Sequence, residues 1–113
     1  MASKLYVVVR GDLKPGLRAA QAVHAAIELS SNSPRGVFDW EVTDGSLVLL
    51  QTKTPSDLEE LRKQVLNLKP YAYGEFHEID LNGELTSIAF WNEEFEVLSD
   101  LVRELPLAFS ELN

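Results

Sequence analysis

Two short apolar runs, LYVVV at residues 5–9 and SLVLL at residues 46–50, are each followed by a polar loop and a segment with helical periodicity. Runs that are nearly continuous in apolar residues are typical of strands buried on both faces. A strand, a helix and a second strand in one sheet form a right-handed crossover, which makes the two strands parallel. This order of segments therefore predicts an α/β fold.

The first helix is expected over residues 15–30, because Pro15 suits a first helical turn and SSNSPRG interrupts the pattern. Its predicted buried stripe consists of Leu17, Ala20, His24 and Ile27, with Gln21 beside it. The segment VFDWEVTDG fits either a short helical turn or the start of a strand. A second helix is expected over residues 54–68, with Thr54 as its N-cap.

Asn82-Gly83 separates two strand-like segments, residues 71–81 and 84–91. This dipeptide is typical of a tight hairpin, since both of its residues tolerate positive φ. A last helix is expected over residues 93–105, before Pro106 and a tail. The sequence thus predicts the order β-α-β-α-β-β-α in a single domain, residues 1–113, with a mixed sheet of about four strands and helices on both faces.

Composition excludes several classes of protein. The 113 residues include no cysteine and two histidines, which argues against disulfides and thiolate metal sites. His24 and Glu28 have metal-ligand spacing on a helix, but no third ligand accompanies them, so we expect no metal and no cofactor. No apolar segment approaches the roughly 18 residues of a membrane span, and the N-terminus lacks the pattern of a signal peptide. A cytoplasmic protein without membrane contact is expected.

Charge is distributed unevenly along the chain. The net charge of −8 argues against broad, nonspecific binding of nucleic acid. Residues 1–36 nevertheless carry five bases and two acids, whereas residues 37–113 carry five bases and sixteen acids. The basic residues therefore gather around the segment RGDLKPGLRAAQAVHAA, residues 10–26, although ordinary solubilising charge would explain this equally well.

That segment follows the first predicted strand. Ligands of open α/β sheets bind beyond the carboxyl ends of the strands, where the loop 10–16 is expected. Gln21 and His24 interrupt a run of alanines in the helix after this loop. We expect them to organise a polar pocket, with the alanines letting the helix lie close to the sheet.

The motif VVVRGDL, a glycine-containing loop and AAQAVHAA resemble the peptidyl-tRNA hydrolase family of the archaeal and eukaryotic type. The matching positions are Arg10, Asp12, Leu13, Gly16, Ala19, Ala20, Gln21, His24 and Ala25. The resemblance implies the mixed sheet of that family. It also implies hydrolysis of the ester between a peptide and the 3′-terminal ribose of tRNA, with the tRNA 3′ end as partner.

The chain departs from the family pattern in two places. Leu17 stands where the family has a lysine, and the nearest cations are Lys14 and Arg18. The acidic loop of the family is shortened here to a tight hairpin, in which Asp80 corresponds to the family's aspartate and Thr86 to its last threonine.

The resemblance supplies two groups of candidate residues. The predicted catalytic residues are Asp12, Gln21, His24 and Asp80. The predicted substrate-binding residues are Arg10, Lys14, Arg18 and Thr86. This hypothesis requires Lys14, Arg18 and His24 to converge in one cleft. Structural roles also fit these residues, such as an Asp12–Arg10 pair or a core position for His24.

An alternative function is a non-catalytic interaction domain on the same fold. Its partner surface, or a homodimer contact, would lie on the C-terminal helix and the tail LPLAF. The acidic residues of that helix are Glu93, Glu94, Glu96 and Asp100. Exposure of Trp91, Phe95, Leu107 and Phe109 as one patch would favour this alternative. Hydrolysis of another small acyl ester is a third possibility.

Overall fold

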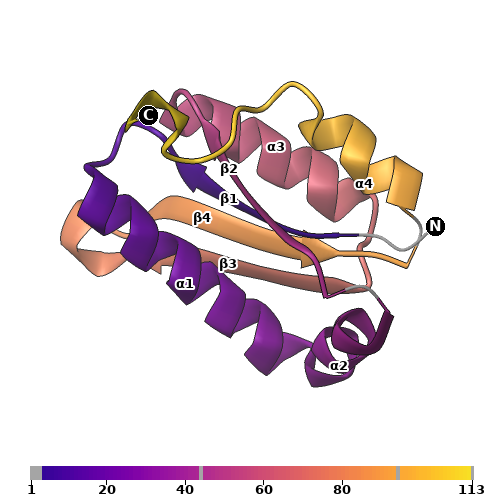
Figure 1. Ribbon diagram of the computed structural model, residues 1–113. Helices are drawn as coiled ribbons and strands as arrows, with labels where there is room; N and C mark the ends of the chain where they lie inside the picture. Colours follow the sequence, from indigo (N-terminus) through magenta and orange to yellow (C-terminus); the bar gives the residue numbers. More distant parts are fainter. Residues whose placement is uncertain (1–3, 44, 94, 113) are drawn as a thin grey trace.

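The computed structural model describes residues 4–43, 45–93 and 95–112 and has a four-stranded sheet with the order β2-β1-β4-β3 (Figure 1). The strands are β1 Leu5–Arg10, β2 Leu47–Thr52, β3 Ala72–Glu78 and β4 Glu84–Trp91. β1 and β2 are parallel, as a crossover through helices requires, and β4 is antiparallel to both of its neighbours. The predicted α/β class with a mixed sheet is confirmed.

Helices cover both faces of the sheet (Figure 1). The helices α1 Pro15–Asn32 and α2 Pro34–Thr43 lie on one face, and α3 Pro55–Asn67 and α4 Phe95–Val102 lie on the other. Alternate residues of β1 divide between two apolar cores, because successive side chains of a strand point to opposite faces. Val7 and Val9 pack with α1, whereas Tyr6 and Val8 pack with α3 and α4.

The buried face of α1 differs from the predicted stripe. The residues of α1 that are buried are Arg18, Gln21, Ala22, Ala25 and Leu29. Leu17, His24 and Ile27 are exposed instead. Ala20, the fourth residue of the predicted stripe, is exposed as well. The prediction was wrong because the face of α1 with Ala22, Ala25 and Leu29 packs on the sheet.

Two predicted helix boundaries also change. Only Ser33 separates α1 from α2. The segment that begins at Val37, which fits two structures in the sequence, is helical as far as Thr43. Trp40 Nε1 in it donates to the carbonyl of Ser46 at 2.8 Å. The predicted N-cap of α3 is confirmed, since Thr54 Oγ1 accepts a hydrogen bond from the Asp57 amide. The last helix ends at Val102, earlier than predicted.

The turn between β3 and β4 is longer than a two-residue hairpin. Asn82 and Gly83 both have positive φ, as their pairing predicts, at 59° and 74°. A 3-10 turn, Ile79–Leu81, precedes them, because the Glu78 carboxylate accepts a hydrogen bond from the Asp80 amide. Asp80 therefore lies in the turn, outside the strand ladder.

Residues 106–112, here called the C-terminal tail, run along the outer edge of β2 (Figure 1). The Gln51 amide donates to the Pro106 carbonyl at 3.1 Å, and the Ala108 amide donates to the Leu49 carbonyl at 2.9 Å. The tail thus adds a short antiparallel segment to this edge of the sheet, and it brings its last residues to the carboxyl end of β2.

Candidate functional site

Arg10 ends β1 and is held by two carboxylates. Its guanidinium donates two hydrogen bonds to Asp12, at 3.1 and 2.9 Å, and one to Glu84 at 2.8 Å. The hydrogen bond from Arg10 lowers the pKa of Asp12, and the same bond raises the pKa of Arg10. Arg10 is buried and paired with two carboxylates. This geometry favours a structural role for Arg10 over substrate binding.

Arg18 is also buried, although sequence reasoning expected it to be available for phosphate. Its Nε and Nη2 atoms donate to the Leu13 carbonyl at 3.2 and 2.8 Å, and Nη1 donates to Gln51 at 2.8 Å and to Glu111. The Phe109 ring lies 5.1 Å from the guanidinium carbon. Arg18 therefore connects α1 with β2 and the C-terminal tail.

Gln21 organises a second cluster, on the side of α1 that faces β3 and β4. Its amide is almost fully buried, at 1% exposure. Gln21 Nε2 donates to Glu78 Oε1 at 2.8 Å, and Gln21 Oε1 accepts from Thr86 Oγ1. The Ser87 hydroxyl donates to the Gln21 backbone carbonyl at 2.6 Å. Two predicted site residues, Gln21 and Thr86, are thus in contact, and Glu78 and Ser87 join them.

A β-bulge explains how Thr86 and Ser87 both reach Gln21. Consecutive side chains of a regular strand point to opposite faces. The register shifts here, from Phe76 opposite Ser87 to His77 opposite Leu85, which leaves Thr86 as the extra residue. Bulges re-aim side chains in this way and are frequent beside functional sites. No pattern of the sequence indicates the bulge, which is why Ser87 was missed.

Glu78 replaces Asp80 as the carboxylate nearest to Gln21. Hydrogen bonds from the Asp80 amide and from Gln21 lower the pKa of Glu78, so the carboxylate is ionised near neutral pH. The Asp80 side chain is exposed in the 3-10 turn. Sequence reasoning missed Glu78 because the resemblance pointed to Asp80 and no pattern indicated the 3-10 turn that follows Glu78.

His24 lies one turn after Gln21 and is exposed rather than in the core. Its ring stacks on Phe76 of β3, with the ring centroids 4.0 Å apart and the planes 7° from parallel. After the hydrogen bonds from the Asp80 amide and from Gln21, the positive charge that His24 can carry also lowers the pKa of Glu78.

Lys14, Arg18 and His24 do not converge in one cleft, so the condition that the predicted site had to meet is not fulfilled. Arg18 contacts Gln51 on β2, whereas His24 stacks on β3, at the opposite edge of the sheet. Lys14 is exposed at the start of α1. Of the predicted residues, the structure brings together Gln21, His24 and Thr86 in one group and Arg10 with Asp12 in another.

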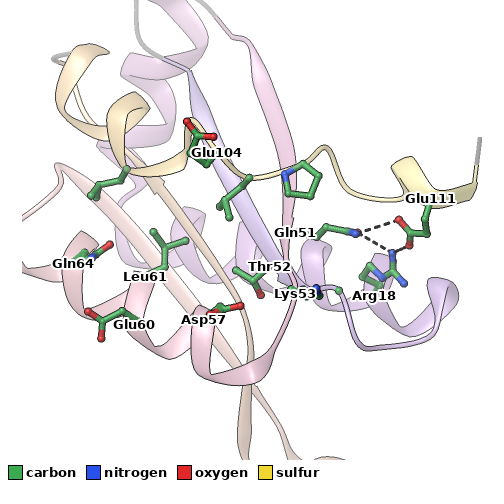
Figure 2. Close-up of a pocket in the computed structure, with 14 residues that line it drawn as sticks. Arg18, Gln51, Thr52, Lys53, Asp57, Glu60, Leu61, Gln64, Glu104 and Glu111 are labelled. Carbon is green, nitrogen blue, oxygen red and sulfur yellow. Dashed lines mark hydrogen bonds and ion pairs between the residues drawn. The ribbon is translucent and has the colours of Figure 1, made fainter.

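An open cavity of about 720 Å³ lies beside Arg18, and Figure 2 shows the residues that line it. It lies between the carboxyl end of β2, the start of α3 and the segment that leads into the C-terminal tail. Arg18 and Lys53 lie at one side, and Asp57, Glu60 and Glu104 line the rest of it (Figure 2). An acidic lining of this kind disfavours phosphate in the wider part of the cavity.

The described residues contain no group of three or more potential metal ligands among histidine, aspartate and glutamate. Within the same residues, no helix has the length and apolar character needed to cross a membrane. Of the four residues proposed as an apolar patch, Trp91 is buried, Phe109 is half-buried and Leu107 is 62% exposed. The Phe95 side chain lies outside the described part of the chain. No contiguous patch of these residues is seen where the structure describes them.

Comparison with known proteins gives the fold alone. No family model matches the sequence, and no curated protein matches it. A solved structure, the protein of unknown function Atu0240 from Agrobacterium tumefaciens strain C58, is similar with a TM-score of 0.70. The similarity covers 95% of this chain and 98% of that one, at 9% sequence identity. This chain and Atu0240 therefore share an architecture, and no function follows from the likeness.

Proposed function

We propose that the chain hydrolyses a carboxylic ester of the peptidyl-tRNA type at a site formed by Gln21, His24, Glu78 and Thr86. The observation that supports this is the Gln21 amide, which is buried and bonded to Thr86 on one side and to Glu78 on the other. A buried amide in a single orientation holds the carboxylate in place before a substrate arrives. Such preorganisation is the main contribution of a protein to hydrolysis.

The chemistry needs a water molecule, a proton acceptor and a fixed acceptor for hydrogen bonds. Glu78 is ionised, so it accepts a hydrogen bond from the water and orients it. His24, which is exposed one turn after Gln21, takes the proton as general base when the water oxygen attacks the acyl carbon. The bond between the acyl carbon and the ribose oxygen breaks, and the proton passes to that oxygen. The products are an acid and an alcohol.

The remaining candidates have supporting roles in this proposal. Lys14 is exposed next to the loop and is suited to contact a phosphate of the tRNA end. Arg10 and Asp12 neutralise each other and fix the loop that leads into α1. Asp80 contributes its backbone amide, which lowers the pKa of Glu78, rather than its own carboxylate.

A matched pair of variants in the turn tests the site. Peptidyl-tRNA cleavage is measured for the wild type, Glu78→Gln and Asp80→Asn, after circular dichroism shows that each is folded. Glu78→Gln keeps the side-chain volume and removes the charge, so turnover is expected to fall by about 10²-fold or more. Asp80→Asn is expected to keep wild-type turnover. Loss of turnover only in Asp80→Asn would move the role to Asp80, and a folded wild type without turnover would refute hydrolysis of this ester.

A non-catalytic binding domain is the second candidate. The observation that favours it is Arg18, whose guanidinium pairs with Glu111 of the chain itself, while Leu17 occupies the family's lysine position. Arg10 is neutralised as well, so few cations remain for a tRNA. A folded protein that neither cleaves peptidyl-tRNA nor binds deacylated tRNA would support this candidate over the enzyme.

A further inference from the structure

The C-terminal tail occupies the β2 edge as a bound peptide would. Its backbone forms an antiparallel bridge between Leu107 and Leu50, flanked by the hydrogen bonds of Gln51 with Pro106 and of Ala108 with Leu49. Extended peptides add to exposed sheet edges through this pattern of backbone bonds, and side-chain pockets supply the specificity. The pocket for this segment is formed by Arg18 and Gln51.

Arg18 and Gln51 hold the two oxygens of the Glu111 carboxylate separately (Figure 2). Arg18 Nη1 donates to Oε1, and Gln51 Nε2 donates to Oε2 at 3.1 Å. Gln51 Oε1 also accepts from the Phe109 backbone amide at 3.1 Å, and the Phe109 ring lies against the guanidinium. Arg18 and Gln51 therefore bind both the carboxylate and a backbone amide of the segment that carries it.

This carboxylate pocket does not depend on Glu111 for its shape. The Leu13 carbonyl accepts two hydrogen bonds from Arg18, and Gln51 accepts a third, so the guanidinium stays aimed at the pocket without the tail. With the tail in place the guanidinium is buried, and Glu111 is its anionic partner. The pocket therefore remains a preformed site for a carboxylate whenever the tail leaves.

Several features make the tail a replaceable occupant. Phe109 has a φ of 67°, a strained conformation for a residue other than glycine. Leu107 projects into solvent, and the Glu111 side chain is 43% exposed. In the described residues, two backbone hydrogen bonds join the tail to the edge strand, fewer than a full strand would form. Elements held in this way open more readily than the core.

We infer that the β2 edge with Arg18 and Gln51 is a docking site for a peptide of another protein that pairs with the strand edge and then turns to present a carboxylate, and that the C-terminal tail is its built-in competitor. The tail defines the chemistry of that ligand. An aromatic residue takes the place of Phe109, whose ring lies against the Arg18 guanidinium, and an acidic residue follows two positions later, at the place of Glu111. The adjoining cavity gives room for further side chains of the ligand. This inference is independent of ester hydrolysis.

Fluorescence anisotropy with a labelled peptide of residues 105–112, LPLAFSEL, tests the site on the full-length protein. The tail of the wild type competes at an effective concentration in the millimolar range, so the peptide is expected to bind it weakly. Glu111→Gln weakens a charge-assisted hydrogen bond, so the peptide is expected to bind this variant at least about tenfold more tightly. Glu104→Gln, which alters another acid of the same cavity, is expected to behave as the wild type.

The peptide itself supplies a second control. Replacing its glutamate by glutamine is expected to reduce binding to the Glu111→Gln protein by about tenfold. Equal binding of the two peptides, or equal binding to the wild type and to Glu111→Gln, would overturn the inference.

Hydrogen exchange measures the opening of the tail without any ligand. The Ala108 and Gln51 amides should exchange faster in Glu111→Gln, whereas the Val8 amide should not change, and unchanged exchange at Ala108 would show that the tail is a fixed part of the fold.

Discussion

His77 has both ring nitrogens facing hydrogen-bond acceptors. Nε2 lies 2.6 Å from Glu75 Oε2, and Nδ1 lies 3.1 Å from the Gly83 carbonyl oxygen. A neutral imidazole donates from only one nitrogen, so both bonds form only when the ring is protonated. The hydrogen bond to Glu75 raises the pKa of His77, against a smaller effect of burial. Arg62, which also faces Glu75, lowers it.

This geometry predicts a titration at His77 above the ordinary histidine pKa of about 6.5. The stabilisation from His77 is complete below that value and is lost as pH rises through the pKa of the folded state. NMR titration of the two histidines, His24 and His77, measures this directly. Glu75→Gln is expected to lower the pKa of His77, since it removes the partner charge. A pKa of His77 at or below 6.5 in the wild type would contradict the double-acceptor geometry.

At the scale of elements, α1 lies unusually close to β3, and glycine makes this possible. A Cβ atom on Gly74 would lie 2.6 Å from Leu29 Cα and 2.8 Å from the carbonyl carbon of Glu28. Those atoms belong to helix backbone, so relief requires the whole helix to shift. Ala22 and Ala25 of α1 face the same region, and their small side chains complete the close contact.

Gly74→Ala is therefore expected to destabilise the protein by about 1–3 kcal/mol or more, the usual cost of overpacking a core. Gly16→Ala is the matched control, because a Cβ there has no atom within 4 Å and the residue lies in the first turn of α1. That change is expected to be neutral or to stabilise by up to about 1 kcal/mol. Urea unfolding of the two variants measures the difference. Equal free energies of unfolding would show that α1 adjusts its position freely.

The same elements show where sequence reasoning succeeds and fails. Continuous apolar strands, Thr54 and the positive φ of Asn82 and Gly83 are local signals, and each led to a confirmed prediction. The buried face of α1 was assigned wrongly, because apolar residues occur on more than one side of this helix and only the contact with β3 selects one. The bulge at Thr86 arises from the pairing of two strands, so no local pattern contains it.

For the molecule as a whole, ion pairs make the free energy of unfolding depend on pH. Burial opposes ionisation of Glu75, but hydrogen bonds from Arg62, His77 and Tyr73 outweigh it and lower the pKa of Glu75 to about 2. The pKa values of Asp12, Glu78 and Glu111 are lowered as well. A carboxyl group with a depressed pKa stabilises the fold above its unfolded-state pKa, and this contribution is lost as pH falls through the folded-state value.

The melting temperature is thus expected to fall progressively as pH is lowered from about 5 toward 2. Glu75→Gln is expected to be less stable than the wild type at pH 7 and to lose less stability over this interval, because its amide does not titrate. Thermal unfolding followed by circular dichroism at several pH values measures both effects. Parallel curves for the two proteins would mean that Glu75 does not have the low pKa that its three partners impose.

The overall charge also limits how a tRNA can be held. Arg10 and Arg18 are neutralised within the molecule, which leaves Lys14 as the exposed cation beside the loop. Each phosphate contact contributes a slope of about −0.7 to −0.9 to the dependence of log K on log salt concentration. With one or two contacts, a total slope of about −1 to −2 is expected for tRNA binding between 50 and 200 mM salt. Lys14→Gln should reduce the slope by nearly one unit, whereas Lys63→Gln on α3 should leave it unchanged. A much steeper slope in the wild type would require a cationic surface that this arrangement of charges does not provide, and it would place the tRNA on a different face of the molecule.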